Sequence, residues 1–493
     1  MPPAQRDHYS VLGLLRDASP EEVRQAHLEI ARRLHPDKNV AAGDTELFLD
    51  AQRAYEVLSN PERRAQYDAT LPPEHETHPA LRHQITLSRP HLYEIAEPQV
   101  IHALLQIAPR HRAQSLSASP INVCLLLDRS TSMKGEKLDT AKAAAIQLIR
   151  TLRPEDIFSL VAFSDKPEVI IPAGDRGDRR QLENRIHMLQ PSGSTEILRG
   201  LEAAMAEVRR SLSAEMVHHV ILLTDGHTYG DEEGCLELAG EAARQGIGMT
   251  ALGIGLDWND GFLDALASRT GGTSDYIFDP ADIRRLLIDK FTMLTRVYVD
   301  DILLEQDERQ GIQVREAFRL QPEGGPIAMH KPLHLGPILQ DVDLRVIFEF
   351  VVEPSALASG PIPLLDGVLR IAATNRTDRV PPLRLQLALD VQPMQKPVQP
   401  PDQLLRALSA WTLYRIQERA GGAADSGDFE GAARSLEHVA SRLRSGGQST
   451  LASTSLLEAQ ELTQERRWKG SGRKDLKYGT RALLLAEGQD ELR

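Results

Sequence analysis

The chain has 493 residues, of which 41% are apolar and 26% charged, and its formal net charge is −13 at pH 7. This length exceeds what one hydrophobic core serves, so the composition predicts several domains with ordinary globular interiors. The acidic balance argues against a general binder of nucleic acids or anionic membranes, because such a protein presents a basic surface.

The cysteines and the N-terminus bear on the cellular compartment. Cys124 lies in an apolar stretch, Cys235 lies in a helical stretch, and the chain has no C-x-x-C pair. Two buried thiols in a long chain are typical of a reducing compartment. Residues 1–10 lack the apolar core of a signal peptide, and no run approaches the ~18 apolar residues of a membrane span. We therefore expect a soluble cytoplasmic protein with no contact to membranes.

Residues 1–70 carry the pattern of four helices. Ser19 followed by Pro20 and two glutamates is a strong start for the second helix, because serine caps a helix and proline suits its first position. Pro36 ends that helix. The third helix places apolar residues at helical spacing as far as Leu58, and Asn60 with the proline after it opens a short fourth helix.

Three segments on these helices point to a known family: DHYSVLGL, HPDKN and AYEVLSNPERRAQYD. A lone His-Pro-Asp would indicate only a turn, but with both flanking helices in register residues 1–70 resemble a J-domain of the DnaJ co-chaperone family. The resemblance implies that the chain stimulates ATP hydrolysis by a DnaK-type chaperone. The residues it assigns to chaperone binding are His35, Pro36, Asp37, Arg24, Arg32, Arg33 and Lys38.

The second helix departs from the usual pattern of that family. Its arginines alternate with Glu21, Glu22 and Glu29, whereas many members are more basic there. Docking on an acidic chaperone surface is therefore expected to be weak or selective. The chain also lacks a Gly/Phe-rich linker and zinc-ribbon cysteines, so it must obtain its clients by another route.

Strands and helices alternate over residues 119–296, which predicts a parallel sheet covered by helices on both faces. The run from Ile121 to Leu127 is apolar at nearly every position and reads as a buried central strand. Asp128, Ser130 and Ser132 follow at alternate positions. Because ligands of open α/β sheets bind beyond the carboxyl ends of the strands, these oxygens predict a site for a hard cation.

Three motifs in this region occur in a recognisable order: DRSTSM at 128–133, SGSTEI at 192–197 and LLTDGH at 222–227. Residues 119–296 thereby resemble a von Willebrand factor type A domain. The resemblance implies a metal-ion-dependent adhesion site formed by Asp128, Ser130, Ser132, Thr195 and Asp225. We expect Mg²⁺ there, or another divalent cation such as Mn²⁺ or Ca²⁺, with one position left for an acidic residue of a protein partner.

Each of these residues also has an ordinary structural interpretation. Ser130, Ser132 and Thr195 could cap the helices that follow them, and Asp225 with the glycine after it could form a plain turn. A bound Mg²⁺ could also activate water. The three loops contain no basic clamp for phosphate and no nucleophile elbow, so we predict that the chain is not an enzyme. Lys142, His187, His218 and His219 are predicted to be surface or strand-edge residues.

The remaining segments complete the domain organisation. We predict a linker at 71–83, strands at 84–118, a β-sandwich-like region at 297–393, a linker at 394–401 and helices at 402–493. The strands at 84–118 are expected to join the later β-region, so that the type A domain is inserted in a discontinuous β-domain. The predicted fold class is therefore multidomain: an all-α J-domain, a doubly wound α/β domain inserted in a β-sandwich-like domain, and a helical C-terminal region.

A local basic patch near Trp468 is predicted to be a solvated loop, and it comprises Arg466, Arg467, Lys469, Arg473, Lys474 and Lys477. For the whole chain we expect a co-chaperone that captures a protein client or complex through the metal site and delivers it to a DnaK-type ATPase. The alternatives are a metal-dependent assembly scaffold and a metal-dependent hydrolase.

Overall fold

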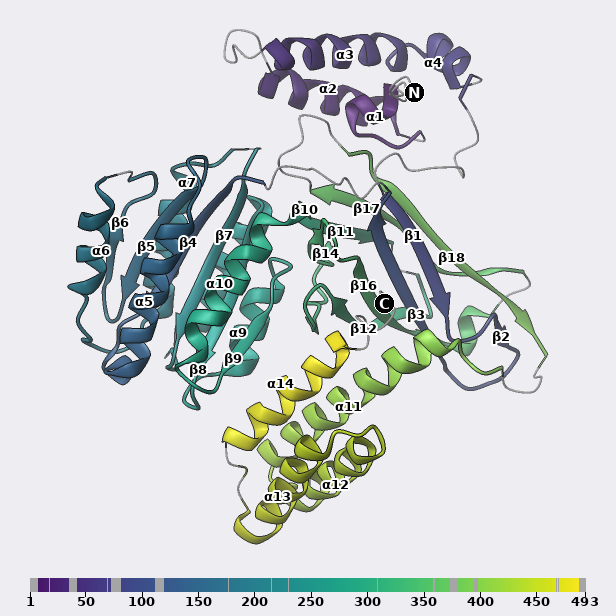
Figure 1. The fold of residues 1–493 in the computed structure, drawn as a ribbon. Coiled ribbons are helices and arrows are strands. Elements are labelled where there is room, and N and C mark those ends of the chain that lie inside the picture. The colour runs from purple at the N-terminus through teal and green to yellow at the C-terminus, as the bar shows by residue number, and fades with distance from the viewer. Residues whose placement is uncertain are drawn as a thin grey trace.

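The computed structural model of the chain describes residues 8–34, 42–71, 81–110, 119–372, 380–393 and 398–486, apart from residues 17, 69, 176, 214, 229, 308, 358–359, 467 and 469. They form four parts: an N-terminal helical unit, an α/β domain, a β-domain of two sheets and a C-terminal group of helices (Figure 1). The predicted fold class is confirmed. Within these ranges no helix combines the length and apolar character needed to cross a membrane.

The N-terminal unit packs its helices around a small apolar core. The helices are α1 (His8–Leu12), α2 (Pro20–Leu34), α3 (Ala42–Leu58) and α4 (Pro61–Asp68). Helix α2 begins with a reciprocal cap, because Glu22 N donates to Ser19 Oγ (3.3 Å) and Ser19 N donates to Glu22 Oε2 (2.7 Å). The core that joins the helices is made of Tyr9, Leu12, Ala18, Val23, Ala26, Ile30, Ala51, Ala54 and Leu58.

The α/β domain is built on a six-stranded sheet in the order β6-β5-β4-β7-β8-β9. Five strands are parallel, and β6 at one edge runs antiparallel to β5. The strands are β4 (Ile121–Asp128), β5 (Ile157–Phe163), β6 (Pro167–Ile171), β7 (Val217–Thr224), β8 (Ile247–Ile254) and β9 (Ser274–Ile277). Strands β4 and β7 are therefore neighbours at the centre, and their carboxyl ends meet at one edge of the sheet.

Helices cover both faces of this sheet (Figure 1). Successive residues of β4 alternate between two cores: Val123 and Leu125 face one, and Cys124 and Leu126 face the other. The first face is covered by α5 (Glu136–Thr151), α6 (Arg179–His187) and α10 (Asp282–Thr295). The second is covered by α7 (Ile197–Arg209), α8 (Glu232–Arg244) and α9 (Asp260–Ser268). Both cysteines are free and buried, as predicted.

The β-domain consists of two five-stranded sheets around one core, in the orders β1-β3-β16-β12-β13 and β14-β11-β17-β18-β2, with a short β10-β15 pair beside them. The strands before the α/β domain are β1 (Leu81–Leu87), β2 (His91–Tyr93) and β3 (Gln99–Pro109). Those after it are β10 (Val297–Val299), β11 (Asp301–Gln306), β12 (Ile312–Gln321), β13 (Gly325–Pro326), β14 (Leu333–His334), β15 (Ile338–Leu339), β16 (Leu344–Val352), β17 (Ile362–Ala372) and β18 (Leu383–Gln392). Because β3 pairs with β16, the α/β domain is an insertion in the β-domain.

The first strands differ in detail from the sequence prediction. Strand β1 begins at Leu81, inside the segment predicted as a linker to residue 83, because Leu81 pairs with Pro109 and is only 1% exposed. The strands predicted within residues 84–118 are also divided between the two sheets. Strand β1 pairs with β3 in one sheet, and β2 pairs with β18 in the other.

The C-terminal helices form a group below the β-domain and beside the α/β domain in Figure 1. They are α11 (Asp402–Asp425), α12 (Phe429–Ser445), α13 (Ser449–Glu465) and α14 (Gly470–Ala486). Trp411 of α11 is 2% exposed and packs with Leu104, Phe318 and Ile347 of the first β-sheet. This contact fixes the helical group to the β-domain.

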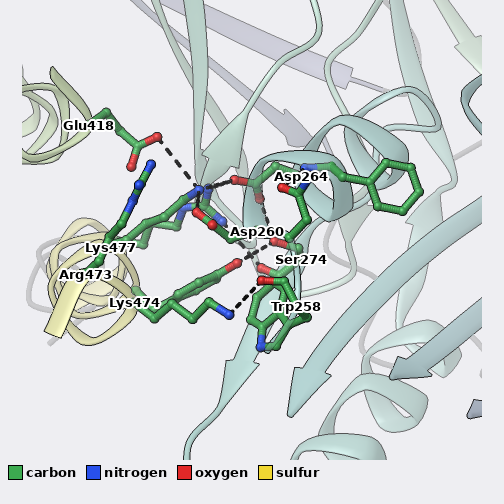
Figure 2. A network of polar contacts seen from close by, with 12 residues as sticks. Trp258, Asp260, Asp264, Ser274, Glu418, Arg473, Lys474 and Lys477 are labelled. Carbon is green, nitrogen blue, oxygen red and sulfur yellow. Dashed lines mark hydrogen bonds and ion pairs between the residues drawn. The ribbon is translucent and has the colours of Figure 1, made fainter. Parts of the chain in front are cut away.

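Helix α14 carries three of the six residues of the predicted basic patch, Arg473, Lys474 and Lys477, and these do not lie in a solvated loop. Figure 2 shows Lys474 and Lys477 directed at the α/β domain. Lys477 is 2% exposed and Nζ lies 2.5 Å from Asp260 Oδ2, while Lys474 Nζ donates to the carbonyl oxygens of Leu256 (2.7 Å) and Trp258 (2.8 Å). The prediction was wrong here because both ammonium groups find their partners in a different domain. Arg466 is exposed as expected, and residues 467 and 469 lie outside the described ranges.

Candidate metal centre

The centre of the site is the carboxylate of Asp128, at the last position of β4. It is fully buried, and it accepts hydrogen bonds from Thr224 Oγ1 (2.6 Å) and from the backbone N of Ser130 (2.7 Å). Burial raises the pKa of Asp128 to about 6, although these hydrogen bonds lower it. The two hydrogen bonds therefore do not fully replace the hydration that the Asp128 carboxylate loses on burial. A bound cation would stabilise the ionised carboxylate.

The two serines of the first loop join Asp128 to Asp225. Ser130 Oγ lies 3.0 Å from Ser132 Oγ, and Ser132 Oγ donates to Asp225 Oδ1 (2.6 Å). Ser130 stands before the short helix η1 (Thr131–Met133) without a side-chain cap, and helix α5 is preceded by Gly135. The capping interpretation of these serines is therefore not supported.

Thr195 comes to this edge of the sheet from a second loop, at residues 192–196. Backbone bonds hold this loop to the first, because Ser192 N donates to Arg129 O (2.8 Å) and Thr131 N donates to Gly193 O (3.2 Å). A Cβ atom on Gly226 would lie 2.8 Å from Thr195 Oγ1, so this threonine rests directly on the loop that carries Asp225. Thr195 does not cap α7, whose N-cap residue is Glu196.

The structure thus brings all five predicted metal-site residues to the edge where β4 and β7 end. Two buried carboxylates and three hydroxyls form a set of hard oxygen donors, which suits Mg²⁺, Mn²⁺ or Ca²⁺ better than soft thiolate-binding metals. Among the described residues, no group of three or more His, Cys, Asp or Glu side chains offers a rival metal site.

One charged residue at this edge was missed by the sequence analysis. Lys137, near the start of α5, places Nζ 2.6 Å from Asp225 Oδ2. Both oxygens of Asp225 are therefore engaged, one by Ser132 and one by Lys137. The sequence signal was a lysine shortly after the DRSTSM motif, but a lysine in the first turns of an amphipathic helix ordinarily faces solvent.

The residues predicted to bind a chaperone are only partly described. Arg24 is exposed on α2 and forms an ion pair with Glu21, with Nη2 and Oε1 separated by 2.7 Å. Arg32 and Arg33 belong to the same helix. His35, Pro36, Asp37 and Lys38 lie outside the described residues, so their role stays a prediction.

Known families match three segments of the chain. The DnaJ domain matches residues 7–68, the von Willebrand factor type A domain matches residues 122–290, and the Sll0103-like C-terminal alpha-helical domain matches residues 402–486. Each match coincides with a structural part described above, and the last identifies helices α11 to α14 as a domain with relatives elsewhere.

Among curated proteins, uncharacterized protein sll0103 of Synechocystis sp. (strain ATCC 27184 / PCC 6803 / Kazusa) is 26% identical over 333 residues, which is 65% of this chain and 78% of that protein. Chaperone protein DnaJ of Cyanothece sp. (strain PCC 7425 / ATCC 29141) is 54% identical over 63 residues, which is 13% of this chain and 17% of that protein. The likeness to DnaJ is thus confined to the N-terminal helices.

Two solved structures resemble most of the chain. A protein described as von Willebrand factor type A from Catenulispora acidiphila has a TM-score of 0.61 and 16% identity, covering 83% of this chain and 98% of its own. The ArnB paralog VWA2 from Sulfolobus acidocaldarius has a TM-score of 0.52 and 17% identity, covering 82% and 98%. At these identities the likeness shows the fold alone. The chain therefore combines a J-domain, a von Willebrand factor type A domain and a Sll0103-like C-terminal helical domain.

Proposed function

We propose that this chain is a J-domain co-chaperone that captures a protein client or complex at the Asp128 site through Mg²⁺ and presents it to a DnaK-type chaperone, whose ATPase the J-domain stimulates. We place this activity in the cytoplasm, in keeping with two free, buried cysteines. No covalent step by the chain itself is part of the proposal.

The observation that carries the proposal is the convergence of three loops on one point of the sheet edge. Asp128 and the hydroxyls of Ser130, Ser132 and Thr195 would hold the ion, and Asp225 is kept beside them by Ser132. A bound divalent ion would supply positive charge for an acidic side chain of the partner. Ser132 is exposed, so a partner has access to the site from solvent.

The J-domain would connect this capture to a DnaK-type chaperone. Residues 7–68 match the DnaJ domain, which implies a DnaK-type partner. A J-domain that lacks the usual client-binding segments needs a separate device to choose its client, and the metal site is such a device. The Glu21–Arg24 ion pair offsets part of the positive charge of α2, which supports a selective rather than a general chaperone contact.

The capture step is tested by affinity purification of partners in Mg²⁺ and in chelator. Asp128→Asn should lose the Mg²⁺-dependent partners, because the amide cannot supply the charge that a divalent ion needs. Asp139→Ala is the matched control, since Asp139 lies close by in the sequence but its side chain is 75% exposed. Partners that remain bound to the wild-type chain in chelator would contradict the proposal.

The chaperone step is tested by ATP hydrolysis of the cognate DnaK-type protein. His35→Gln should abolish its stimulation while leaving Mg²⁺-dependent capture intact. If stimulation survives, the co-chaperone role is wrong. If capture is intact but the wild-type chain stimulates no such ATPase, the chain is an assembly scaffold instead.

A further inference from the structure

The contact between Lys137 and Asp225 assigns a role to a residue outside the five metal-site positions. The lysine side chain is 30% exposed, whereas that of Asp225 is fully buried. Nζ lies 2.6 Å from Asp225 Oδ2. An ion pair with one buried partner is not an ordinary surface pair, because the buried carboxylate has lost most of its water and depends on the ammonium group.

The position of Lys137 is set from more than one side. A Cβ atom on Gly255 would lie 3.7 Å from Lys137 Nζ, so the loop after β8 borders the ammonium group. Gly255 has a φ of +69°, a left-handed conformation that favours glycine. The next residue of this loop, Leu256, is held at its carbonyl by Lys474 of α14. The Lys137 ammonium group therefore lies between Asp225 and the loop after β8.

The charges at this edge decide what Lys137 does. Asp128 and Asp225 stand at the ends of the neighbouring strands β4 and β7, and Ser130 and Ser132 link them, so two carboxylates share this edge. Lys137 cancels the charge of Asp225, which leaves the group with one net negative charge. A divalent ion then leaves a net positive charge, whereas the same site without the lysine would become neutral.

We propose that Lys137 is a specificity-determining residue of the metal site: it weakens metal binding but makes the loaded site select a carboxylate over a neutral oxygen ligand. This inference rests on the proposed function, since it concerns the partner of that same site. A positively charged edge favours an acidic side chain, and a neutral edge would accept a backbone carbonyl or an amide nearly as well.

The first experiment measures Mn²⁺ binding to the full chain by electron paramagnetic resonance, with no partner present. Lys137→Met should bind Mn²⁺ about tenfold more tightly, because a positive charge close to the ion is removed. Lys137→Arg keeps the charge and should bind like the wild type. Lys134→Met removes an exposed lysine from the same segment and should change nothing. Unchanged or weaker Mn²⁺ binding in Lys137→Met would overturn the inference.

The second experiment adds acetate or acetamide as probes at saturating Mn²⁺ and follows the change in the Mn²⁺ spectrum. The wild type and Lys137→Arg should respond to acetate at lower concentration than to acetamide, and Lys137→Met should lose most of this preference. An equal preference in all variants would contradict the inference. If the preference depends on Lys137 but no protein is captured in a metal-dependent manner, the proposed function fails and the inference about Lys137 stands.

Discussion

Lys477 of the C-terminal domain places its ammonium group 2.9 Å from Asp264 Oδ2 and 2.5 Å from Asp260 Oδ2 of the type A domain. Burial would raise the pKa of Asp264, but the charges of Arg481 and Lys477 hold it well below its usual range. The two carboxylates have left water, and their ion-pair partners Lys477 and Arg481 come from across the domain boundary. The two domains therefore stabilise each other through a buried ionic network (Figure 2).

Lys477→Ala should destabilise the chain by about 3–5 kcal/mol, because Asp260 loses its ion-pair partner and Asp264 is left with Arg481 alone. Urea unfolding of the full chain measures this loss. Arg285→Ala is the control, since its ion pair with Asp282 is exposed at the surface and should contribute less than ~1 kcal/mol. Equal losses in the two variants would show that the Lys477 network is no stronger than a surface pair.

Gly226→Ala should weaken the metal site without unfolding the domain. The added Cβ would lie 2.8 Å from Thr195 Oγ1, so the threonine must shift from its present position against the Asp225 loop. We expect Mn²⁺ affinity to fall about tenfold, in line with the effect of displacing a group near a metal. Isothermal titration measures the affinity, and circular dichroism checks the fold.

Gly422→Ala provides the matched control for that variant. A Cβ at Gly422 meets no atom within 4 Å, and the residue lies inside helix α11, where alanine is favourable. It should leave Mn²⁺ affinity unchanged and stabilise the chain slightly. If Gly226→Ala also leaves Mn²⁺ affinity unchanged, Thr195 is not part of the metal site.

Protonation of His219 should cost the type A domain stability between about pH 6.5 and pH 4, against an opposite contribution from Asp128, whose pKa is raised to about 6. His219 is buried in β7, with Nε2 2.9 Å from Thr250 Oγ1, and burial lowers its pKa to about 4. The folded pKa is lower than the unfolded one, so protons bind the unfolded state more tightly and stability is lost as the pH falls. For a shift from about 6.5 to about 4, the loss at pH 5 is ~2 kcal/mol.

Urea unfolding at pH 7 and pH 5 measures this dependence. His219→Gln should reduce the difference in unfolding free energy between the two pH values. Part of the difference should remain, because burial also lowers the pKa of His218. The exposed His187 serves as control, because His187→Gln should keep the full difference. A difference that is unchanged in His219→Gln would contradict the assignment.

The convergence of the five candidate metal-site residues could be predicted because they lie at fixed places relative to strand ends. Asp128 ends an apolar run that only a central strand explains, and Asp225 ends another, so neighbouring parallel strands must bring them to one edge. Thr195 lies between them in the sequence and reaches the same edge. The position of such residues can be predicted from sequence because the local apolar pattern and the sheet topology determine it together.

Other features depend on tertiary contacts that no local pattern contains. Lys137 and Lys477 have the sequence context of solvated lysines, and they are recognisable as partners of buried carboxylates only once the sheet edge and α14 are in place. His219 was expected at the surface or at a strand edge, but β7 lies at the centre of the sheet and buries it. The division of β1 from β2 depends on which sheet each one joins.

The insertion of the type A domain has a mechanical consequence. The chain enters the domain at the start of β4 and leaves it after α10 into β10, at the end opposite to the carboxyl ends of β4 and β7 (Figure 1). A pull on a partner captured at the Asp128 site would therefore run along β4 toward the opposite end of the sheet, where the chain leaves into β10. Because β4 is paired with β5 on one side and β7 on the other, the pull would load both hydrogen-bond ladders in shear, all bonds together. A partner captured there as proposed would be held against tension by both ladders together.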